Sequence, residues 1–462
     1  MKHTETSKIY GSPRTHGMHQ IRAENSVINR QVMLPAEKFL HNETISGALL
    51  IVCAIAALIW ANSPWSRSYF ALCDLPVSIQ IGSYAIAMNL QHWINDGLMS
   101  VFFFVVALEI KREMICGDLS EARRAALPVA AALGGMILPA GLYLALNAGG
   151  KGAAGWGIPM ATDIAFTVAI LALLGSRVPP YLRMFLLTFA ITDDVGSILV
   201  IAINYTAHFS APAMAAAIAV LGVILTMNRL GFRLAVSYAL PAIVFWVAIL
   251  KSGVHPTIAG VILGAVTPAK SPGCRGTFIE TVQFTLPNVC ESMDREESER
   301  SEVLLGRIEE LARQTESPLA RLERTVHPWV SFLILPVFAL MNAGVAVSGE
   351  FIRQAFTSPV TLGVMLGLIV GKMAGVTGFA WLAVQLGWAV LPRGVAWRHI
   401  MGTGLIGGVG FTVALFITGL AFSDKVLAEE AKIGVISASI IAGMGGYLFL
   451  LLAGHGQKNP DQ

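Results

Sequence analysis

Apolar runs of about 20 residues recur along most of the chain and constrain its fold more than any other feature. A helix of about that length spans the ~30 Å hydrocarbon core of a bilayer. Only 13% of the 462 residues are charged and 55% are hydrophobic, with a mean hydropathy of +0.66. Soluble domains carry roughly 25% charged residues. The sequence therefore predicts an all-α polytopic membrane protein whose surroundings are the lipid bilayer.

About twelve membrane spans can be placed on these runs. We expect them at roughly 44–62, 91–114, 122–146, 154–175, 182–206, 209–228, 233–250, 254–269, 327–346, 358–385, 397–421 and 430–454. With the N-terminus inside, most of the 32 lysines and arginines fall in cytoplasmic segments, as the positive-inside rule requires. The layout predicts a multi-pass protein with both termini in the cytoplasm.

The segments outside the spans have their own expected roles. Residues 1–43 are predicted to form a cytoplasmic tail, because a cleaved signal peptide would place its apolar core nearer the start. Spans one to eight would occupy residues 44–269, a cytoplasmic insert 270–325, spans nine to twelve 326–455, and a second cytoplasmic tail 456–462. Residues 77–87 alternate with period two around Gly82-Ser83, which predicts a small external β-hairpin at about 75–89.

Within the insert, residues 296–314 show the periodicity of an amphipathic helix. A solvated helix is the simpler interpretation, and a regulatory or partner-binding element is the alternative.

The sequence also argues against several classes of function. Its five cysteines fall singly, so neither a disulfide framework nor a zinc site is indicated. It contains no G-x-x-x-x-G-K-[ST] segment, so ATP-driven pumping has no support. We expect no cofactor and no nucleic-acid partner.

Three carboxylates lie near the middle of predicted spans. Asp163 belongs to the ATDIAF segment of span four, and Asp193 and Asp194 lie together in span five. An ionised side chain at bilayer depth costs at least a few kcal/mol and usually marks an ion or proton pathway. Lys372 in span ten is the only lysine or arginine in the interior of a predicted span, since the others lie within a few residues of a span end or outside the spans. One lysine does not neutralise three carboxylates, so at least one of them must be protonated, hydrated or bound to a cation.

Such a site can exchange ions, because protons and a hard cation compete for the same oxygens. Adjacent helical residues point about 100° apart, so one of Asp193 and Asp194 can face a cavity shared with Asp163 while the other faces Lys372. The hydroxyl or backbone oxygen of Thr162 could add a ligand, or its hydroxyl could bond only its own backbone. A buried salt bridge that merely locks helices together is the structural alternative.

Two spans carry helix-breaking residues beside these charges. Span four contains Gly155-Trp156-Gly157-Ile158-Pro159 just before Asp163, and span eleven holds five glycines between Gly402 and Gly410. Broken helices would expose half-helix ends, where an N-terminus favours a carboxylate and a C-terminus favours a lysine. Tight helix packing is the other explanation of the glycines.

The chain resembles the bacterial NhaA-type sodium/proton antiporters. The resemblance covers about residues 40–455, excluding much of 270–320. It rests on Trp93-Ile94-Asn95-Asp96-Gly97-Leu98-Met99, Leu108-Glu109-Ile110-Lys111-Arg112-Glu113, the ATDIAF and TDD segments, Ser252-Gly253-Val254-His255, His327-Pro328-Trp329 and Gly371-Lys372. These antiporters are themselves a type case of transporters built from inverted repeats. The resemblance implies twelve helices, with spans three to five and ten to twelve as the repeats and spans four and eleven as broken, crossing helices.

The resemblance also assigns roles to the buried charges. Asp163 and Asp194 would bind Na⁺ or Li⁺, and Asp193 and Lys372 would take part in proton exchange. The Asp-Asp pair implies electrogenic exchange, with more protons moved than sodium ions. The β-hairpin would form the contact of a homodimer.

A cytoplasmic charge cluster senses pH in this family. Carried over by motif, the pH-response candidates are Glu109, Arg112, Glu113, Glu323 and His327, together with His255. Without the resemblance, both histidines would be structural and residues 109–113 an ordinary helix end. Arg324 stands where the best-studied member has histidine, and the preceding loop is longer here. Asp96 is an accessory candidate, or a helix-terminal charge.

The sequence therefore predicts a pH-regulated secondary antiporter of the bacterial inner membrane, not an enzyme. It would extrude Na⁺, and Li⁺ as well, in exchange for entering protons. An intramembrane aspartyl protease is a weaker alternative, since Gly408-Val409-Gly410-Phe411 lacks the aspartate of the required Gly-x-Gly-Asp. A passive cation channel is another alternative, and it would need no proton competition.

Overall fold

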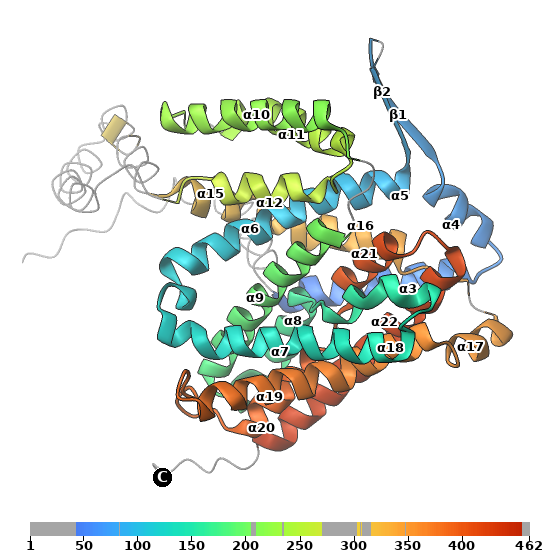
Figure 1. The fold of residues 1–462 in the computed structure, drawn as a ribbon, viewed down its shortest axis with the longest axis vertical. Helices are drawn as coiled ribbons and strands as arrows, with labels where there is room; N and C mark the ends of the chain where they lie inside the picture. Colours follow the sequence, from blue (N-terminus) through green and yellow to red (C-terminus); the bar gives the residue numbers. More distant parts are fainter. Residues whose placement is uncertain are drawn as a thin grey trace, which may run out of the picture.

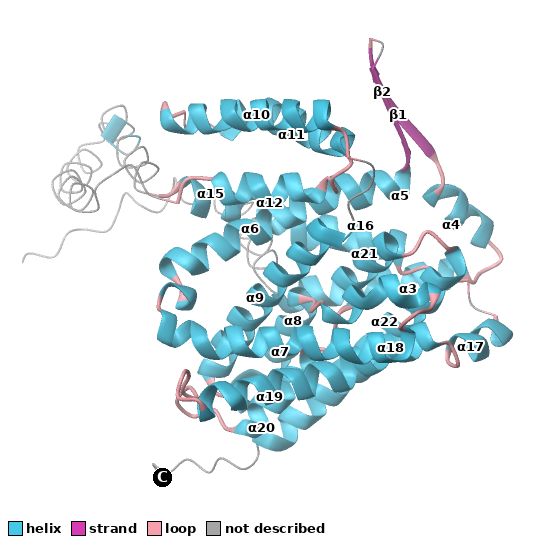
Figure 2. Cartoon of the chain, viewed as in Figure 1, coloured by secondary structure: helices cyan, strands magenta, loops and turns pink. Residues whose placement is uncertain are grey.

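The computed structural model describes residues 43–82, 84–204, 209–232, 235–269, 303–304, 306, 316–346 and 348–454. Within these ranges the chain is a bundle of long helices with one β-hairpin at its edge (Figures 1 and 2). The predicted tails and the amphipathic segment 296–314 lie almost wholly outside the described residues. The predicted helical, polytopic fold is confirmed.

A helical element stands at each of the twelve predicted positions. They are α3 (Glu43–Ala61), α5–η2–α6 (Leu90–Trp93, Ile94–Leu98, Met99–Cys116), α7 (Ala122–Asn147), η4 with α8 (Lys151–Met160, Ile164–Leu174), α9 (Pro180–Asn204), α10 (Ala211–Arg229), α11 (Ala235–Ser252), α12 (Thr257–Val266), α15–η6–α16 (Pro318–Trp329, Val330–Ile334, Leu335–Asn342), α18–η7–α19 (Pro359–Leu366, Gly367–Gly371, Lys372–Gln385), α20 with α21 (Trp397–Ile406, Phe411–Ala421) and α22 (Lys425–Gly454). Short helices α4 (Ser66–Cys73), η3 (Asp118–Ser120), η5 (Gly175–Arg177) and α17 (Gly349–Ala355) connect them.

Length and hydropathy qualify fewer than twelve of these elements as full spans. Eight helices in the described part of the chain are long and apolar enough to cross a membrane, and two bent pairs raise the total to ten. The helices α11 and α12 are apolar but shorter. With a rise of 1.5 Å per residue, α12 covers only about 15 Å.

Span nine begins earlier than the sequence analysis predicts. The helix α15 starts at Pro318 rather than near residue 327. Ser317 accepts a hydrogen bond from the Ala320 N–H over 3.2 Å, and Pro318 occupies the first turn. These are standard helix-start signals, and the charges that follow them obscured the span because they lowered its hydropathy.

Both predicted helix breaks are present. The axis bends by 40° between η4 and α8 and by 49° between α20 and α21. The two breaks meet, because the Asp163 N–H donates a hydrogen bond to the Val409 carbonyl over 2.7 Å. Spans four and eleven are therefore joined at their interruptions.

Glycines bring two further spans into close contact. A Cβ atom at Gly134 of α7 would lie 2.1 Å from the Gly375 carbonyl oxygen of α19, and the reverse substitution meets the Gly134 oxygen at the same distance. The interpretation of glycines as packing residues thus holds here, beside the broken helices. This close contact holds α19, the helix that begins with Lys372, against α7.

The β-hairpin pairs β1 (Pro76–Ile81) with β2 (Tyr84–Asn89) in antiparallel register. Gly82 occupies the turn with φ of +62°, which suits a residue without Cβ. Trp93 donates from Nε1 to the Val77 carbonyl over 3.0 Å and ties the hairpin to span two. The hairpin projects from the bundle beside α5 and α4 (Figure 1).

Candidate functional site

Asp163 lies where the two broken spans meet. Its carboxylate accepts a hydrogen bond from the Phe166 N–H over 3.1 Å, so it caps the N-terminus of α8. It also accepts bonds from the Thr412 N–H, over 3.0 Å, and from the Thr412 hydroxyl in the first turn of α21. The side chain therefore faces two helix N-termini, whose partial positive charges favour a carboxylate. Asp163 is 2% exposed.

Thr162 also connects the two helix breaks. Its hydroxyl donates to the Gly407 carbonyl over 2.8 Å. The alternative that this hydroxyl bonds only its own backbone is therefore wrong. The carbonyl that it binds belongs to the interruption of span eleven, so Thr162 and Asp163 hold the same junction from adjacent positions.

Asp193 faces Lys372. The Lys372 Nζ donates to Asp193 Oδ2 over 2.7 Å, and neither side chain is exposed. Lys372 follows the π-helical turn η7, and its Nζ lies 5.7 Å from the centre of the Phe189 ring. Such turns often occur at functional sites. The expectation that one aspartate of the pair turns toward Lys372 is met by Asp193.

Asp194 faces a different space. It is 1% exposed, and neither carboxylate oxygen has a hydrogen-bond partner among the residues that the structure describes. Together with Asp163 it lines a cavity of about 450 Å³. The two adjacent aspartates therefore face different environments, Asp193 toward Lys372 and Asp194 toward the cavity, as their helical spacing predicts.

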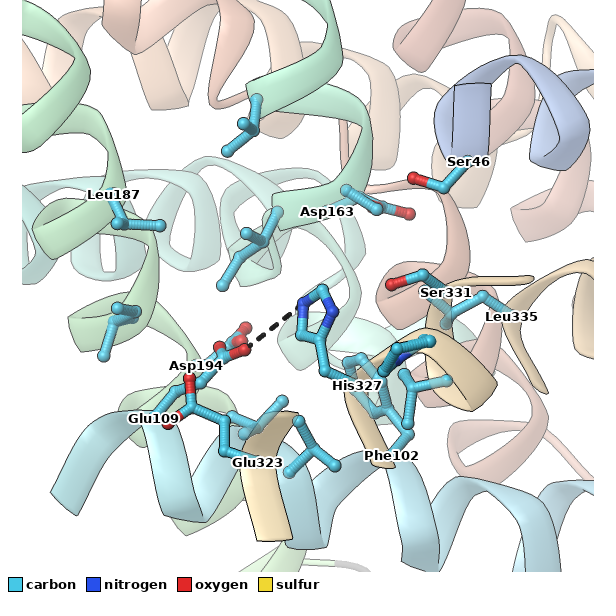
Figure 3. A pocket seen from close by; sticks show the side chains of 18 of the residues that line it. Ser46, Phe102, Glu109, Asp163, Leu187, Asp194, Glu323, His327, Ser331 and Leu335 are labelled. Carbon is cyan, nitrogen blue, oxygen red and sulfur yellow. Dashed lines mark ion pairs between the residues drawn. The ribbon is translucent and has the colours of Figure 1, made fainter. Parts of the chain in front are cut away.

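The cavity joins these aspartates to a set of charged residues on α6 and α15 (Figure 3). At that end it is lined by Glu109, Arg112, Glu323, Arg324 and His327. Ser46 and Ser331 add hydroxyl groups along its wall. The predicted cation-binding carboxylates and four of the pH-response candidates thus line one cavity.

The charged residues at this end are paired. Arg112 forms an ion pair with Glu323, and its Nη2 lies 3.9 Å from Glu113 Oε1. His327 Nε2 lies 3.7 Å from Glu109 Oε1, the contact drawn as a dashed line in Figure 3. The structure thereby gathers the five candidates of the predicted charge cluster, although Glu113 contacts Arg112 without lining the cavity.

His255, the sixth pH-response candidate, lies apart from this cluster. Its Nε2 lies 3.6 Å from Asp96 Oδ1, and its Nδ1 lies 2.8 Å from the Thr257 hydroxyl. Asp96 lies in the π-helical turn η2, inside span two. It is separated from Glu109 by thirteen residues, or about 20 Å of helix. Asp96 and His255 therefore contact each other, so they are not an isolated helix-terminal charge and a lone histidine.

Thr412 is the main site residue that the sequence analysis misses. It gives Asp163 two of its hydrogen bonds. The signal was present, because Thr412 lies two residues after the last of the span-eleven glycines, Gly410, and so falls in the first turn of the next half-helix. Thr412 reaches the Asp163 carboxylate only because the two helix breaks lie in contact.

Comparisons with known proteins agree with one another. The family model described as Na⁺/H⁺ antiporter 1 matches residues 37–450. The protein named Na(+)/H(+) antiporter NhaA of Oleidesulfovibrio alaskensis is 46% identical over 439 residues, covering 93% of this chain and 96% of the relative. Na(+)/H(+) antiporter NhaA 2 of Myxococcus xanthus is 46% identical over 89% of this chain and 88% of its own. The Syntrophobacter fumaroxidans NhaA is 43% identical over 93% of both chains.

Proposed function

The chain belongs to the NhaA-type Na⁺/H⁺ antiporters, and from this membership we propose how its residues divide the exchange. Asp163 and Asp194 bind the transported Na⁺, and Asp193 and Lys372 carry protons. The observation that carries the proposal is Asp194, a buried carboxylate without a hydrogen-bond partner in the described ranges, which lines the cavity. An unpaired ionised carboxylate is costly to bury, so this group must hold either a proton or a cation.

Asp163 suits the second ligand position. Its hydrogen bonds come from fixed backbone and threonine donors, which hold the carboxylate in one orientation. Each carboxylate oxygen has more than one lone pair, so it can accept these bonds and still contact a cation. Thr162 supports the same junction through the Gly407 carbonyl.

Competition between Na⁺ and protons then couples the two fluxes. Binding of Na⁺ displaces a proton from Asp194, and protonation from the opposite side releases the ion. The Asp193–Lys372 pair supplies a further proton when the site changes sides. We propose that the exchange is therefore electrogenic, and that Li⁺, another hard cation, uses the same oxygens.

The charge cluster around Glu109 and His327 is the proposed pH-responsive element. Histidine is the side chain that ordinarily titrates near neutral pH, and the 3.7 Å pair lies at the end of the cavity away from Asp163. Protonation of His327 strengthens its hold on Glu109. Loss of that proton removes a positive charge beside Glu109, so its carboxylate attracts cations into the cavity more strongly.

The surroundings of the protein follow from its family and loops. The chain is a multi-pass membrane protein. We further propose a bacterial inner-membrane location with both termini in the cytoplasm, and a homodimer formed through the β-hairpin.

Everted vesicles that hold a respiration-driven pH gradient test the function. Added Na⁺ or Li⁺ should dissipate the gradient, and Asp163→Asn or Asp194→Asn should abolish the response. Absence of any response between pH 6.5 and 9, with inserted protein, would overturn the proposal. A channel would pass Na⁺ without moving protons, so measurement of both fluxes separates the two. The family is one of transporters, so the protease alternative no longer applies.

A further inference from the structure

Ser197 is a buried residue of α9 whose hydroxyl has no evident structural use. The residue is 1% exposed, and its Oγ has no hydrogen-bond partner in the part of the chain that the structure describes. A helical hydroxyl commonly donates to the carbonyl four residues earlier, as Thr192 does to Thr188 over 2.7 Å. A buried polar group left unpaired costs free energy and calls for an explanation.

The position of Ser197 on its helix points to the buried aspartates. At about 100° per residue, Ser197 projects about 40° from Asp193 and about 60° from Asp194, between the two. It lies one helical turn further along α9. Asp193 Oδ1, both oxygens of Asp194 and Ser197 Oγ are all buried without partners within the described residues. Unpartnered oxygens from three side chains therefore share one stripe of the helix.

Ser197 also lies on the opposite side of Asp194 from the cavity. The cavity is lined on α9 by Leu187, Ile191 and Asp194, and not by Ser197. An ion that enters by the cavity and leaves by the other side passes Asp194 first and then reaches the next oxygen along the helix. Hard cations are bound by oxygen ligands.

We propose that Ser197 Oγ is a further ligand of the transported cation, binding it together with the Asp194 carboxylate. This inference rests on the proposed antiport function and adds to it a residue that sets cation affinity. The competing explanation is a hydroxyl tolerated in the packing. These explanations differ in their consequences, since removal of an unpaired buried hydroxyl leaves the fold as stable or more stable.

The test uses Ser197→Ala in the full chain, in everted vesicles, with Na⁺ and Li⁺ titrated separately. We expect the apparent KM for Na⁺ to rise by roughly three- to tenfold, the effect of losing one polar contact, with the maximal response and the thermal unfolding temperature retained. Thr192→Val is the matched control, because the Thr192 hydroxyl bonds its own helix and the residue projects about 100° from Asp193 and about 160° from Asp194. It should keep the wild-type KM.

Ser197→Cys separates ligation from packing. The sulfur fills the space of the hydroxyl but is a soft donor that suits hard cations poorly, so this variant should resemble Ser197→Ala. A wild-type KM in Ser197→Ala, a full recovery in Ser197→Cys, or an equal loss in Thr192→Val would each overturn the inference. A wild-type protein without a Na⁺ response would instead overturn the proposed function itself.

Discussion

Lys372 donates a hydrogen bond to Asp193 over 2.7 Å, although the two residues are 179 positions apart in the chain. Both side chains are completely buried. The contact joins α9 to α19, and a buried charge that loses its partner is strongly destabilising. The same pair carries a proton in the proposed exchange. Its structural and functional contributions can be separated because they respond differently to neutral substitutions.

The stability of the pair depends on both charges. Asp193→Asn leaves the Lys372 ammonium buried without a counter-charge, which should lower the free energy of unfolding by about 3–5 kcal/mol. Adding Lys372→Gln removes that charge and should recover most of the loss. The apparent thermal unfolding temperature in detergent measures both effects. Equal destabilisation in the single and double variants would contradict this explanation.

Transport by the same double variant tests the proton role. Without ionisable groups at either position, any remaining exchange should lose the proton carried by the pair and become insensitive to an imposed membrane potential. Wild-type exchange should respond to that potential. An unchanged response in the double variant would show that the pair only stabilises the packing of α9 against α19.

Thr412 should control the Asp163 site through its hydroxyl. Thr412→Val keeps the side-chain shape and the backbone N–H but removes one bond to a carboxylate, worth about 1.5–3 kcal/mol. We expect the apparent affinity for Na⁺ to fall by at least tenfold, measured from the ion concentration for half-maximal response. Thr412→Ser retains the donor and is the control. Matching affinities in the two variants would show that the hydroxyl contributes nothing.

Gly375 should tolerate no side chain. A Cβ at this position would lie 2.1 Å from the Gly134 oxygen, so Gly375→Ala must separate α7 from α19 and should cost about 1–3 kcal/mol or more. Gly378 lies on the same helix, and a Cβ there meets no described atom within 4 Å. Gly378→Ala should therefore stabilise α19 by up to about 1 kcal/mol. Unfolding temperatures of the two variants should move in opposite directions.

Features set by local sequence could be predicted well. The hairpin follows from alternation around Gly82-Ser83, and the breaks follow from clustered Gly and Pro. Charge balance alone paired Lys372 with one of three aspartates. Helical periodicity shows that Asp193 and Asp194 project in two different directions, but it does not show which of them faces Lys372. The packing of α9 against its neighbours decides that Asp193 does.

Contacts between distant segments could not be read from the sequence. Asp163 meets Thr412 across 249 positions, and no local pattern marks either residue as the partner of the other. His255 and Asp96 looked like separate candidates because their pairing depends on how α12 packs against α6. The proposed role of Ser197 could be inferred only because its hydroxyl is without a partner in the described structure.

The ion pair between His327 and Glu109 should set part of the pH dependence. His327→Gln stays neutral at every pH, so Glu109 is never held by an imidazolium and the cavity remains attractive to cations at lower pH. Two unit charges about 4 Å apart in water interact by about 1 kcal/mol, or roughly 0.7 of a pH unit. We expect the rise of activity with pH to begin lower by about that amount, measured as the pH of half-maximal response to Na⁺. His92, an exposed histidine on α5 that contacts Asn89, provides the control, and His92→Gln should leave the profile unchanged. A profile in His327→Gln that coincides with the wild type, or moves to higher pH, would contradict the role assigned to this pair.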